Sequence, residues 1–307
     1  MSDVGRFRRL AVVTALFAYL QIALGGVVRV SGSGLGCPDW PLCNGRPYPP
    51  ADAHAIVEYS HRAVGSVTGL LIIATVVMAW IVFRKRRPLV PWLATASLIG
   101  VVGEGILGGI VVAQELTPWL VLVHLGLAMM ILGFLVATAV AAMPASSGVR
   151  DPGFRRLAAV ATAATYLLLL TGSSVVASGA DESCQSWPLC GGGFALDIAG
   201  VNAYTMLHRG SVLVIGLLLL YVLWTAMRRW RSVDGMGLIA GATIAIFLLQ
   251  VAVGAGSAIV GGALFDGLHV AMATLVWSGV LATALLALPR ADSEPELSRL
   301  AVGRRSA

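Results

Sequence analysis

The stretch "EYSHRAVGSVTGLLIIATVVMAWIVF", residues 58–83, begins with a carboxylate, an imidazole and a guanidinium and continues as a long apolar run. Residues 63–83 carry no charged side chain. About 20 consecutive apolar residues are enough for an α-helix to cross the hydrocarbon core of a bilayer. We therefore predict a transmembrane helix over residues 57–83, with Glu58, His61 and Arg62 close to one end of it.

The rest of the chain has the same character. Of its 307 residues, 58% are hydrophobic and only 12% are charged, which is typical of a membrane protein rather than of a soluble domain. Seven further apolar stretches are long enough to span a bilayer: 10–30, 90–113, 118–142, 155–178, 203–225, 236–260 and 265–288. The predicted fold class is therefore an all-α integral membrane protein with eight transmembrane helices.

Most basic residues fall on one side of this eight-helix path. They are Arg6, Arg8 and Arg9, the run from Arg84 to Arg87, Arg150, Arg155 and Arg156, Arg228, Arg229 and Arg231, and Arg290, Arg299, Arg304 and Arg305. Cytoplasmic loops are enriched in Lys and Arg, so both termini are predicted to be cytoplasmic. The formal net charge of +6 then reflects membrane topology, and no nucleic-acid partner is expected.

An internal repeat divides the chain into two similar halves. Segment 32–43, "GSGLGCPDWPLC", returns at 179–190 as "GADESCQSWPLC", and "HRAVGSVTGLL" from His61 returns from His208 as "HRGSVLVIGLL". The offset is 147 residues in both cases. An even number of helices per half gives both copies the same orientation. We therefore predict two tandem four-helix bundles, residues 1–145 and 146–307, related by a parallel pseudo-twofold repeat.

Four of the five histidines occupy equivalent places near the outer ends of the second, fourth, sixth and eighth helices: His61, His124, His208 and His269. A single histidine in a membrane more often forms a hydrogen bond between helices than binds a metal. Here each half supplies one histidine from its second helix and one from its fourth, as axial ligation of a heme iron requires. We predict two bis-histidine heme sites; zinc and copper are disfavoured because neither pair has a third ligand at helical spacing.

Three arginines outside the cytoplasmic pattern are candidates to bind heme propionates. Arg62 and Arg209 directly follow proposed ligands at the outer face, where a propionate needs a cation or a donor. The alternative is that both side chains extend to the lipid headgroups. Arg29 is the third candidate, and it has no counterpart in the repeat because the aligned residue is Val176.

Glu58 precedes His61 by three residues, so both side chains are expected on the same face of the helix. The aligned residue before His208 is Thr205, so the second half keeps the ligand but lacks the acid. This difference favours proton-coupled chemistry at the first site and a purely redox role at the second. The alternative is an interfacial carboxylate that is solvated by water and headgroups.

Three further polar residues lie near the proposed sites. Glu104 aligns approximately with Gln250 and is expected to make a polar contact between helices, because a carboxylate that faces lipid is costly. Asp266 precedes His269 by three residues and is expected to cap the eighth helix. His54, the fifth histidine, has no counterpart in the repeat and is expected to be a residue of the first outer loop.

All four cysteines lie in the two outer loops, and each pair ends in "WPLC". On the oxidising side of a membrane the expected state is one local disulfide per loop, Cys37-Cys43 and Cys184-Cys190. A redox or metal-relay role for the first pair is the alternative. Trp40 and Trp187 are expected to anchor the loops at the membrane interface.

The loop "GSGLGCPDWPLC", the Glu-x-x-His-Arg of the second helix, the repeated His-Arg and the tandem halves together resemble the heme A synthases of bacterial respiratory membranes. The resemblance covers nearly the whole chain. It implies an oxidoreductase acting on a CH3 group, which oxidises a ring methyl of heme O to the formyl group of heme A for terminal oxidases. It also implies that Glu58 is the catalytic carboxylate, that His61 and His124 flank the substrate heme O, and that His208 and His269 hold a heme b cofactor.

The resemblance further implies a location in the bacterial cell membrane, with the hemes and the cysteine loops toward the extracytoplasmic side. A heme O synthase and oxidase assembly factors are the implied partners, and the sequence is compatible with an oligomer. Two other functions are open. A non-catalytic diheme membrane electron carrier would use the same four histidines without needing Glu58, and a thiol oxidoreductase would depend on the cysteine pairs.

Overall fold

The computed structural model describes residues 3–192 and 194–290, and Arg299, Arg304 and Arg305 of the predicted cytoplasmic tail lie outside them. The described residues form eight long helices: α1 (Asp3–Val30), α2 (Ala53–Phe83), α3 (Leu89–Ala113), α4 (Pro118–Ala141), α5 (Pro152–Ala177), α7 (Asn202–Arg229), α8 (Met236–Ile259) and α9 (Ala263–Leu286). Each is long and apolar enough to cross a membrane. The predicted all-α class and the eight spans are confirmed.

The start of α2 shows how the chain enters a span. Asp52 is the N-cap residue, and its carboxylate accepts the backbone N–H of Ala55 over 2.9 Å. The helix therefore begins at Ala53, four residues before the predicted start. The prediction that His54 is a loop residue was wrong, because His54 lies in the first turn of α2. Its Nδ1 is 3.1 Å from Oγ of Ser33.

A short helix, α6 (Ala180–Ser183), follows α5 and was not predicted. Gly179 separates the two helices with a left-handed backbone (φ 73°), a conformation that glycine adopts without steric cost. Four residues are too few for a hydrophobic period, which explains why sequence analysis missed this helix.

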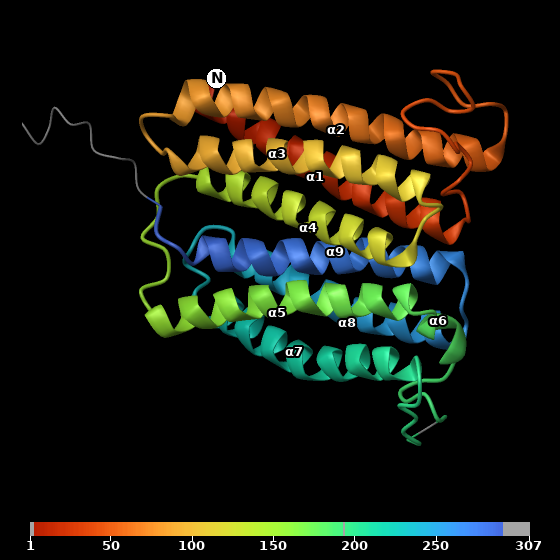
Figure 1. Ribbon diagram of the computed structural model, residues 1–307. Coiled ribbons are helices and arrows are strands. Elements are labelled where there is room, and N and C mark those ends of the chain that lie inside the picture. Colours follow the sequence, from red (N-terminus) through yellow and green to blue (C-terminus); the bar gives the residue numbers. More distant parts are fainter. Residues whose placement is uncertain (1–2, 193, 291–307) are drawn as a thin grey trace, which may run out of the picture.

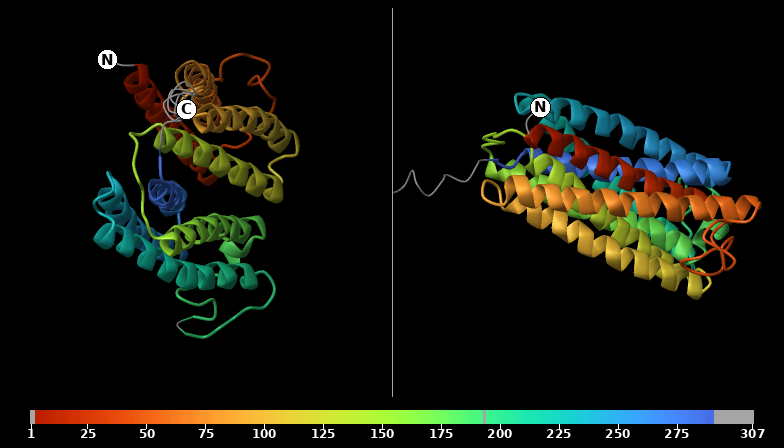
Figure 2. Two further views of the ribbon diagram at one scale, coloured as in Figure 1. Left: turned by 90° about the vertical axis from the view of Figure 1, so that its left-hand side faces the viewer. Right: turned by 90° about the horizontal axis from the view of Figure 1, so that it is seen from above.

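The long helices form two groups that meet along α4 and α9. In one group α1, α2, α3 and α4 pack against one another, and in the other α5, α7, α8 and α9 do so (Figure 1). Helix α9 also contacts α1 and α4, and in the end-on view it lies on the side of its group that faces the first group (Figure 2, left). The indole of Trp277 on α9 donates to the carbonyl of Met129 on α4 over 3.0 Å. The symmetry of the two halves and the boundary at residue 145 stay predictions.

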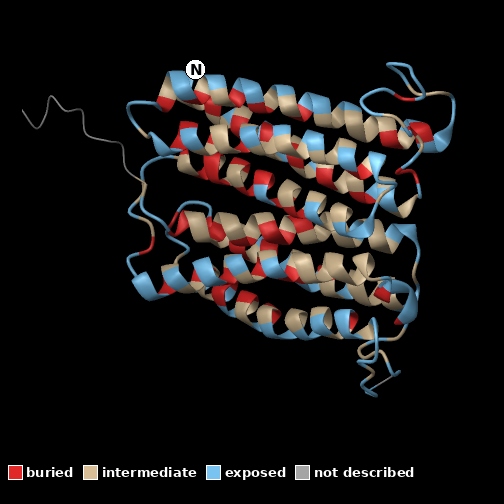
Figure 3. Ribbon diagram, in the orientation of Figure 1, coloured by how far each residue is buried: buried red, intermediate tan, exposed pale blue. Residues whose placement is uncertain are grey.

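Exposed residues lie along the outward faces of the long helices (Figure 3), and many of them are large and apolar. Leu70 is 67% exposed, Ile81 73% and Leu238 79%. Exposing apolar surface to water costs roughly 25 cal/mol per Å², so a belt of such residues around the bundle would be unfavourable in solution. These faces are suited to contact with lipid.

The two ends of the bundle carry different groups. The first cysteine loop (residues 31–52) and the second (residues 184–192 and 194–201) lie at one end, and the start of α1 lies at the other (Figure 1). At the latter end Arg8 donates to the carbonyl of Ala142 over 2.6 Å and Arg87 to that of Ala141 over 3.1 Å. Both cations satisfy carbonyl groups at the C-terminus of α4. The side of the membrane that each end faces stays a prediction.

Candidate functional site

The four predicted ligands lie within about two and a half turns of the starts of their helices, at the end of the bundle that carries the cysteine loops. They are His61 on α2, His124 on α4, His208 on α7 and His269 on α9. His61 is within electrostatic range of His124, and His208 is within range of His269. The structure therefore brings the histidines together in the two expected pairs, one in each group of helices.

Each histidine ring packs against a glycine of a facing helix. The pairs, with the distance from an ideal Cβ position on the glycine to ring Cε1, are Gly25 with His61 (3.1 Å), Gly108 with His124 (3.3 Å), Gly172 with His208 (3.0 Å) and Gly254 with His269 (2.8 Å). A side chain at these glycines would displace the ring. Sequence analysis missed them, although Gly25 and Gly172 are 147 residues apart, the same offset as the cysteine pairs.

A polar side chain also lies against each ring. The contacts are Gln21 Nε2 to His61 Nε2 (3.2 Å), Glu104 Oε1 to His124 Nδ1 (3.1 Å), Thr171 Oγ1 to His208 Nδ1 (3.1 Å) and Gln250 Nε2 to His269 Nδ1 (3.1 Å). The hydroxyl of Thr171 donates to the carbonyl of Leu168, so its Oγ1 accepts from Nδ1 of His208 and leaves Nε2 of that ring for a metal. At His269 the contact comes from the amide nitrogen of Gln250, which is a donor, so Nδ1 of that ring accepts. The predicted interhelical contact of Glu104 is confirmed, whereas Gln21 and Thr171 were not identified from the sequence.

Buried nitrogens without partners distinguish the first pair of histidines from the second. Nδ1 of His61 and Nδ1 of His124 are buried, and neither forms a hydrogen bond with a described residue. Glu104 Oε1 lies close to the second of these atoms but is not aligned for a hydrogen bond, and Oε2 of Glu104 also lacks a partner. Unpaired buried polar atoms are costly, so these groups are suited to bind something that enters the site.

The donor set fits a heme better than a bare ion. Within residues 3–192 and 194–290, no group of three or more His, Cys, Asp or Glu side chains is arranged to hold a metal ion. A metal bound by one histidine pair must therefore bring other ligands with it, as the iron of a porphyrin does. Neutral imidazole also places no protein charge in a low-dielectric environment.

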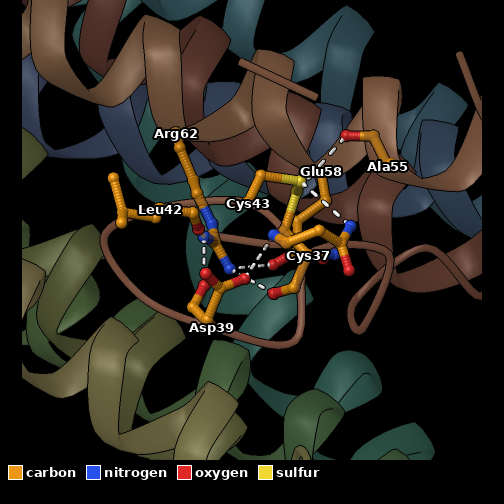
Figure 4. Close-up of polar contacts among 8 residues, drawn as sticks. Cys37, Asp39, Leu42, Cys43, Ala55, Glu58 and Arg62 are labelled. Carbon is orange, nitrogen blue, oxygen red and sulfur yellow. Dashed lines mark hydrogen bonds and ion pairs between the residues drawn. A yellow bond between two sulfur atoms is a disulfide. The ribbon is translucent and has the colours of Figure 1, made fainter. Parts of the chain in front are cut away.

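Glu58 lies beneath the first cysteine loop and is only 3% exposed. Its Oε2 accepts the backbone N–H of Cys37 over 2.8 Å, and its Oε1 accepts Nη2 of Arg62 over 2.5 Å (Figure 4). The alternative of a carboxylate solvated at the interface is therefore wrong, because loop and helix exclude water from it. The described contacts of Glu58 are with the loop and Arg62, and none is with the ring of His61.

Arg62 fastens the first cysteine loop to α2. Its Nη1 donates to the carbonyls of Asp39 and Leu42, both over 2.6 Å, and its Nη2 donates to the carbonyl of Cys37 over 2.7 Å. With the bond to Glu58, all four N–H groups of the two terminal nitrogens are used, and Nε is the remaining donor. A propionate would therefore meet Nε of Arg62 or replace one of the loop carbonyls.

Arg209 makes a similar contact in the second half. Its Nη1 donates to the carbonyls of Ser186 (2.6 Å) and Pro188 (3.1 Å), whereas its Nη2 has no partner in the part of the chain that the structure describes. It thus keeps more donors for a propionate than its counterpart in the first half. Thr205, which replaces the carboxylate, is buried, and its hydroxyl donates to the carbonyl of Ala180 over 3.4 Å.

Arg29, the third propionate candidate, and Asp266, the predicted helix cap, both have partners in the structure. Arg29 forms an exposed ion pair with Asp181 over 3.5 Å, which joins the end of α1 to α6, and its role toward a propionate stays a prediction. Asp266 does not cap α9, so that prediction was wrong: the N-cap is Gly262, and Asp266 lies inside the first turn, where it accepts a hydrogen bond from the hydroxyl of Ser257.

Both predicted disulfides are present. The Cα atoms are 4.5 Å apart in Cys37–Cys43 and 5.1 Å apart in Cys184–Cys190. In the first loop the backbone N–H groups of Gly45 and Asn44 donate to the carboxylate of Asp39, which holds the pKa of that carboxyl below its ordinary value. Trp40 and Trp187 are about half exposed at this end of the bundle, as interfacial anchors would be.

Comparison with known proteins identifies the family of the chain. Residues 8–281 match a protein family described as "Cytochrome oxidase assembly protein". A "Heme A synthase" of Symbiobacterium thermophilum is 30% identical over 260 residues, which cover 81% of this chain and 84% of the relative. A "Heme A synthase" of Exiguobacterium sibiricum is 30% identical over 267 residues (83% and 86%), and one of Listeria monocytogenes is 25% identical over 287 residues (90% and 94%). The chain belongs to the heme A synthase family of cytochrome oxidase assembly proteins.

Proposed function

We propose that this protein oxidises a ring methyl of heme O to the formyl group of heme A and uses a bound heme b to do so. One observation carries the proposal: both helix groups hold a histidine pair, but among the described residues the one buried carboxylate, Glu58, belongs to the first group. A site that only transfers electrons needs ligands alone, whereas a site that also removes protons needs a base nearby. The first half is therefore the substrate site.

The residues divide the work between the two sites. His61 and His124 would hold the substrate heme O, and His208 and His269 would hold heme b. When bound, heme b supplies one-electron transfer. Arg209 and Arg29, together with Nε of Arg62, are the candidates to hold propionates. The cysteine pairs fix the loops that cover the outer end of the bundle.

Glu58 is placed to take protons as the methyl group is oxidised. Each of its oxygens accepts one hydrogen bond, from Cys37 N–H and from Arg62, and keeps further acceptor capacity. The guanidinium stabilises the ionised carboxylate in a site from which water is largely excluded. A proton taken up at Oε1 or Oε2 can leave toward the outer end of the bundle, because the carboxylate lies directly beneath the first cysteine loop.

We further propose that the protein works in a bacterial cell membrane, with both termini cytoplasmic and the cysteine loops extracytoplasmic. Disulfides persist in an oxidising compartment, and cytoplasmic loops are enriched in Arg and Lys. The two disulfides lie at one end of the bundle. Arg8 and Arg87, which donate to carbonyl groups at the C-terminus of α4, lie at the other end, which supports this orientation. A heme O synthase would supply the substrate, and oxidase assembly factors would receive the product.

Analysis of bound hemes tests the site assignment. The protein is purified from cells that make heme O and have no other enzyme that makes heme A. The hemes are then extracted and separated by chromatography. We expect heme b together with a farnesylated heme in the wild type, loss of the farnesylated heme in His61→Ala and His124→Ala, and loss of heme b in His208→Ala and His269→Ala. Two b hemes and no farnesylated heme in the wild type would instead support a diheme electron carrier.

A further inference from the structure

Gln21 on α1 contacts the ring of His61 at Nε2, one of the two ring nitrogens through which a histidine binds metals. Its amide nitrogen lies 3.2 Å from that atom. Among the described contacts of the four rings, this is the one made to Nε2, because the polar side chains beside His124, His208 and His269 lie against Nδ1. Gln21 therefore differs from the other three partners in the atom that it covers.

The chemistry of this contact prevents a bond to iron for as long as the contact is made. An amide N–H can only donate, so Nε2 of His61 accepts with its lone pair. A neutral imidazole has one such lone pair, and it is the pair that the ring gives to a metal. Gln21 and a heme iron therefore compete for the same atom. An Nε2–H that donated to the amide oxygen would leave no lone pair either, so the competition holds for both orientations of the amide.

The second half has no such competitor at the equivalent histidine. Leu168 aligns with Gln21, and Thr171 aligns with Leu24, both at the offset of 147 residues. The hydroxyl of Thr171 donates to the carbonyl of Leu168 and accepts from Nδ1 of His208, so Nε2 of that ring keeps its lone pair. The partner in the second half thus holds the ring by its other nitrogen, whereas Gln21 covers the atom that would bind iron.

Gly65 on α2 leaves the space that the amide of Gln21 occupies. An ideal Cβ on Gly65 would lie 3.0 Å from the amide nitrogen, and the aligned residue in the second half is Val212. The amide oxygen of Gln21 is buried and has no hydrogen-bond partner among the described residues. Because an unpaired buried polar atom is costly, packing alone would favour an apolar side chain here, such as the leucine of the second half.

His61 also lacks a partner on its other nitrogen. Nδ1 of His61 is buried and forms no hydrogen bond with a described residue, whereas Nδ1 of His208 has Thr171. A hydrogen bond to the outer nitrogen of a metal-bound imidazole strengthens the ring as a ligand. We propose that Gln21 is a positioning residue that competes with heme iron for Nε2 of His61 and so makes the first site release its heme more readily than the second. The inference rests on the proposed function, since it takes His61 as a ligand of the substrate heme.

The proposal gives the two sites different exchange behaviour with the same type of ligand. A site that takes up heme O and gives up heme A must exchange its heme in every reaction cycle, whereas a cofactor site keeps its heme. When the heme leaves the first site, Nε2 of His61 is satisfied again by Gln21, so no buried nitrogen is left unpaired at that atom. Release from the first site is favoured for this reason.

Release of hemes from the purified holoprotein tests the proposal. The holoprotein is diluted in steps into a fixed excess of detergent micelles, which take up released heme. The protein is then captured through an affinity tag, and the hemes that it retains are identified by chromatography. In Gln21→Leu, which copies the second half, we expect the farnesylated heme to bind roughly two- to tenfold more tightly, the equivalent of one net hydrogen bond, with heme b unchanged. Gln21→Met, which keeps the length of the side chain but has no N–H, should give the same increase.

The sign of the change separates competition from support. Thr171→Leu, the matched control, removes the partner of Nδ1 in His208 and should weaken the binding of heme b. If Gln21→Leu and Gln21→Met weaken the binding of the farnesylated heme or leave it unchanged, the proposal is overturned while the ligand assignment stands. If Gln21→Leu does not fold, Gln21→Met decides alone. If His61→Ala retains the farnesylated heme, the proposed function fails and this inference fails with it.

Discussion

Arg62 makes three hydrogen bonds to carbonyl groups of the first cysteine loop and one to Glu58, with a side chain that is only 14% exposed. Removing one partner of a buried ion pair leaves the other charge uncompensated, which costs about 3 to 5 kcal/mol. We therefore expect Arg62→Ala to lower the free energy of unfolding by about that amount, as measured by denaturant unfolding in detergent.

Arg209→Ala is the matched control for this prediction. Arg209 also donates to two loop carbonyls, but Thr205 takes the place of the carboxylate, so no buried charge is left behind. We expect a loss of about 1.5 to 3 kcal/mol, the range for hydrogen bonds to a charged group. Equal losses in the two variants would contradict the view that Glu58 is ionised and paired with Arg62.

The environment of Glu58 shows what the local sequence predicts and what it does not. The spacing of Glu58 and His61 predicts correctly that both belong to one helix turn near the outer end of α2. It does not predict that the carboxylate turns to the N–H of Cys37, because that contact depends on how a loop 21 residues away folds back. The same reason hid Gln21 and Thr171, which approach the rings from other helices.

At the scale of helices, the close approach of α8 to α9 depends on Gly254. A Cβ there would lie 2.8 Å from Cε1 of His269, whereas one on Gly108 would lie 3.3 Å from that of His124. Contacts under 3.0 Å require the ring to move, so we expect Gly254→Ala to lose more than half of the heme b and Gly108→Ala to lose less of the heme in the first half. Heme content per protein after purification measures both. Gly105→Ala is the control, because a Cβ at Gly105 meets no atom within 4 Å.

The turn within the first cysteine loop depends on the ionised carboxylate of Asp39. The N–H groups of Gly45 and Asn44 donate to it over 2.7 and 2.5 Å and hold its pKa below the ordinary value, about 3.9. A depressed folded-state pKa contributes stability that is present above the ordinary pKa and lost as the pH falls through the folded-state value. We therefore expect a phosphine reductant to cleave Cys37–Cys43 faster at such acid pH.

Two comparisons check the loop prediction. In the second loop, Ser186 is the residue that aligns with Asp39, so Cys184–Cys190 has no such carboxylate. The ratio of its cleavage rate in acid to its cleavage rate at neutral pH is the reference for the first disulfide. Asp39→Asn should make the first disulfide as easily reduced at neutral pH as the wild type is in acid. An Asp39→Asn variant with wild-type cleavage rates throughout would show that the carboxylate does not hold the loop.

The helices themselves could be predicted almost completely. The length of the apolar stretches predicted all eight spans, with most ends within three residues of the structure. What escaped prediction was short or tertiary. Helix α6 has too few residues to show a hydrophobic period. The four glycines that pack against the histidine rings cannot be distinguished in the sequence from other small residues of packed helices, because their contacts depend on the tertiary structure.

At the scale of the whole molecule, the two groups of helices are joined through α4 and α9. Trp277 is buried there, and its indole donates to the carbonyl of Met129 over 3.0 Å. Trp277→Phe keeps an aromatic ring but removes the donor, which should lower the free energy of unfolding by about 1 to 3 kcal/mol. Thermal unfolding followed by circular dichroism measures the loss. Trp92→Phe, at an exposed lipid-facing position, should change the midpoint little.

The placement of the four histidines favours an enzyme over a transmembrane electron carrier. All four lie at the end of the bundle that holds the cysteine loops, whereas a relay across the bilayer would stack its hemes from one side to the other. Both hemes would thus lie side by side at one depth, joined through the packing of α4 and α9. This arrangement suits electron transfer between a substrate site and a cofactor site within one protein.

The most direct test of this account is chromatography of hemes from membranes that contain either the wild type or Glu58→Gln, each expressed beside a heme O synthase. Glutamine keeps the size of the buried side chain but removes its charge and its capacity to take a proton. The account predicts heme A in the wild type, and bound heme O or a partly oxidised heme in Glu58→Gln. A wild type that binds both hemes but makes no heme A, or a Glu58→Gln variant that makes as much heme A as the wild type, would contradict it.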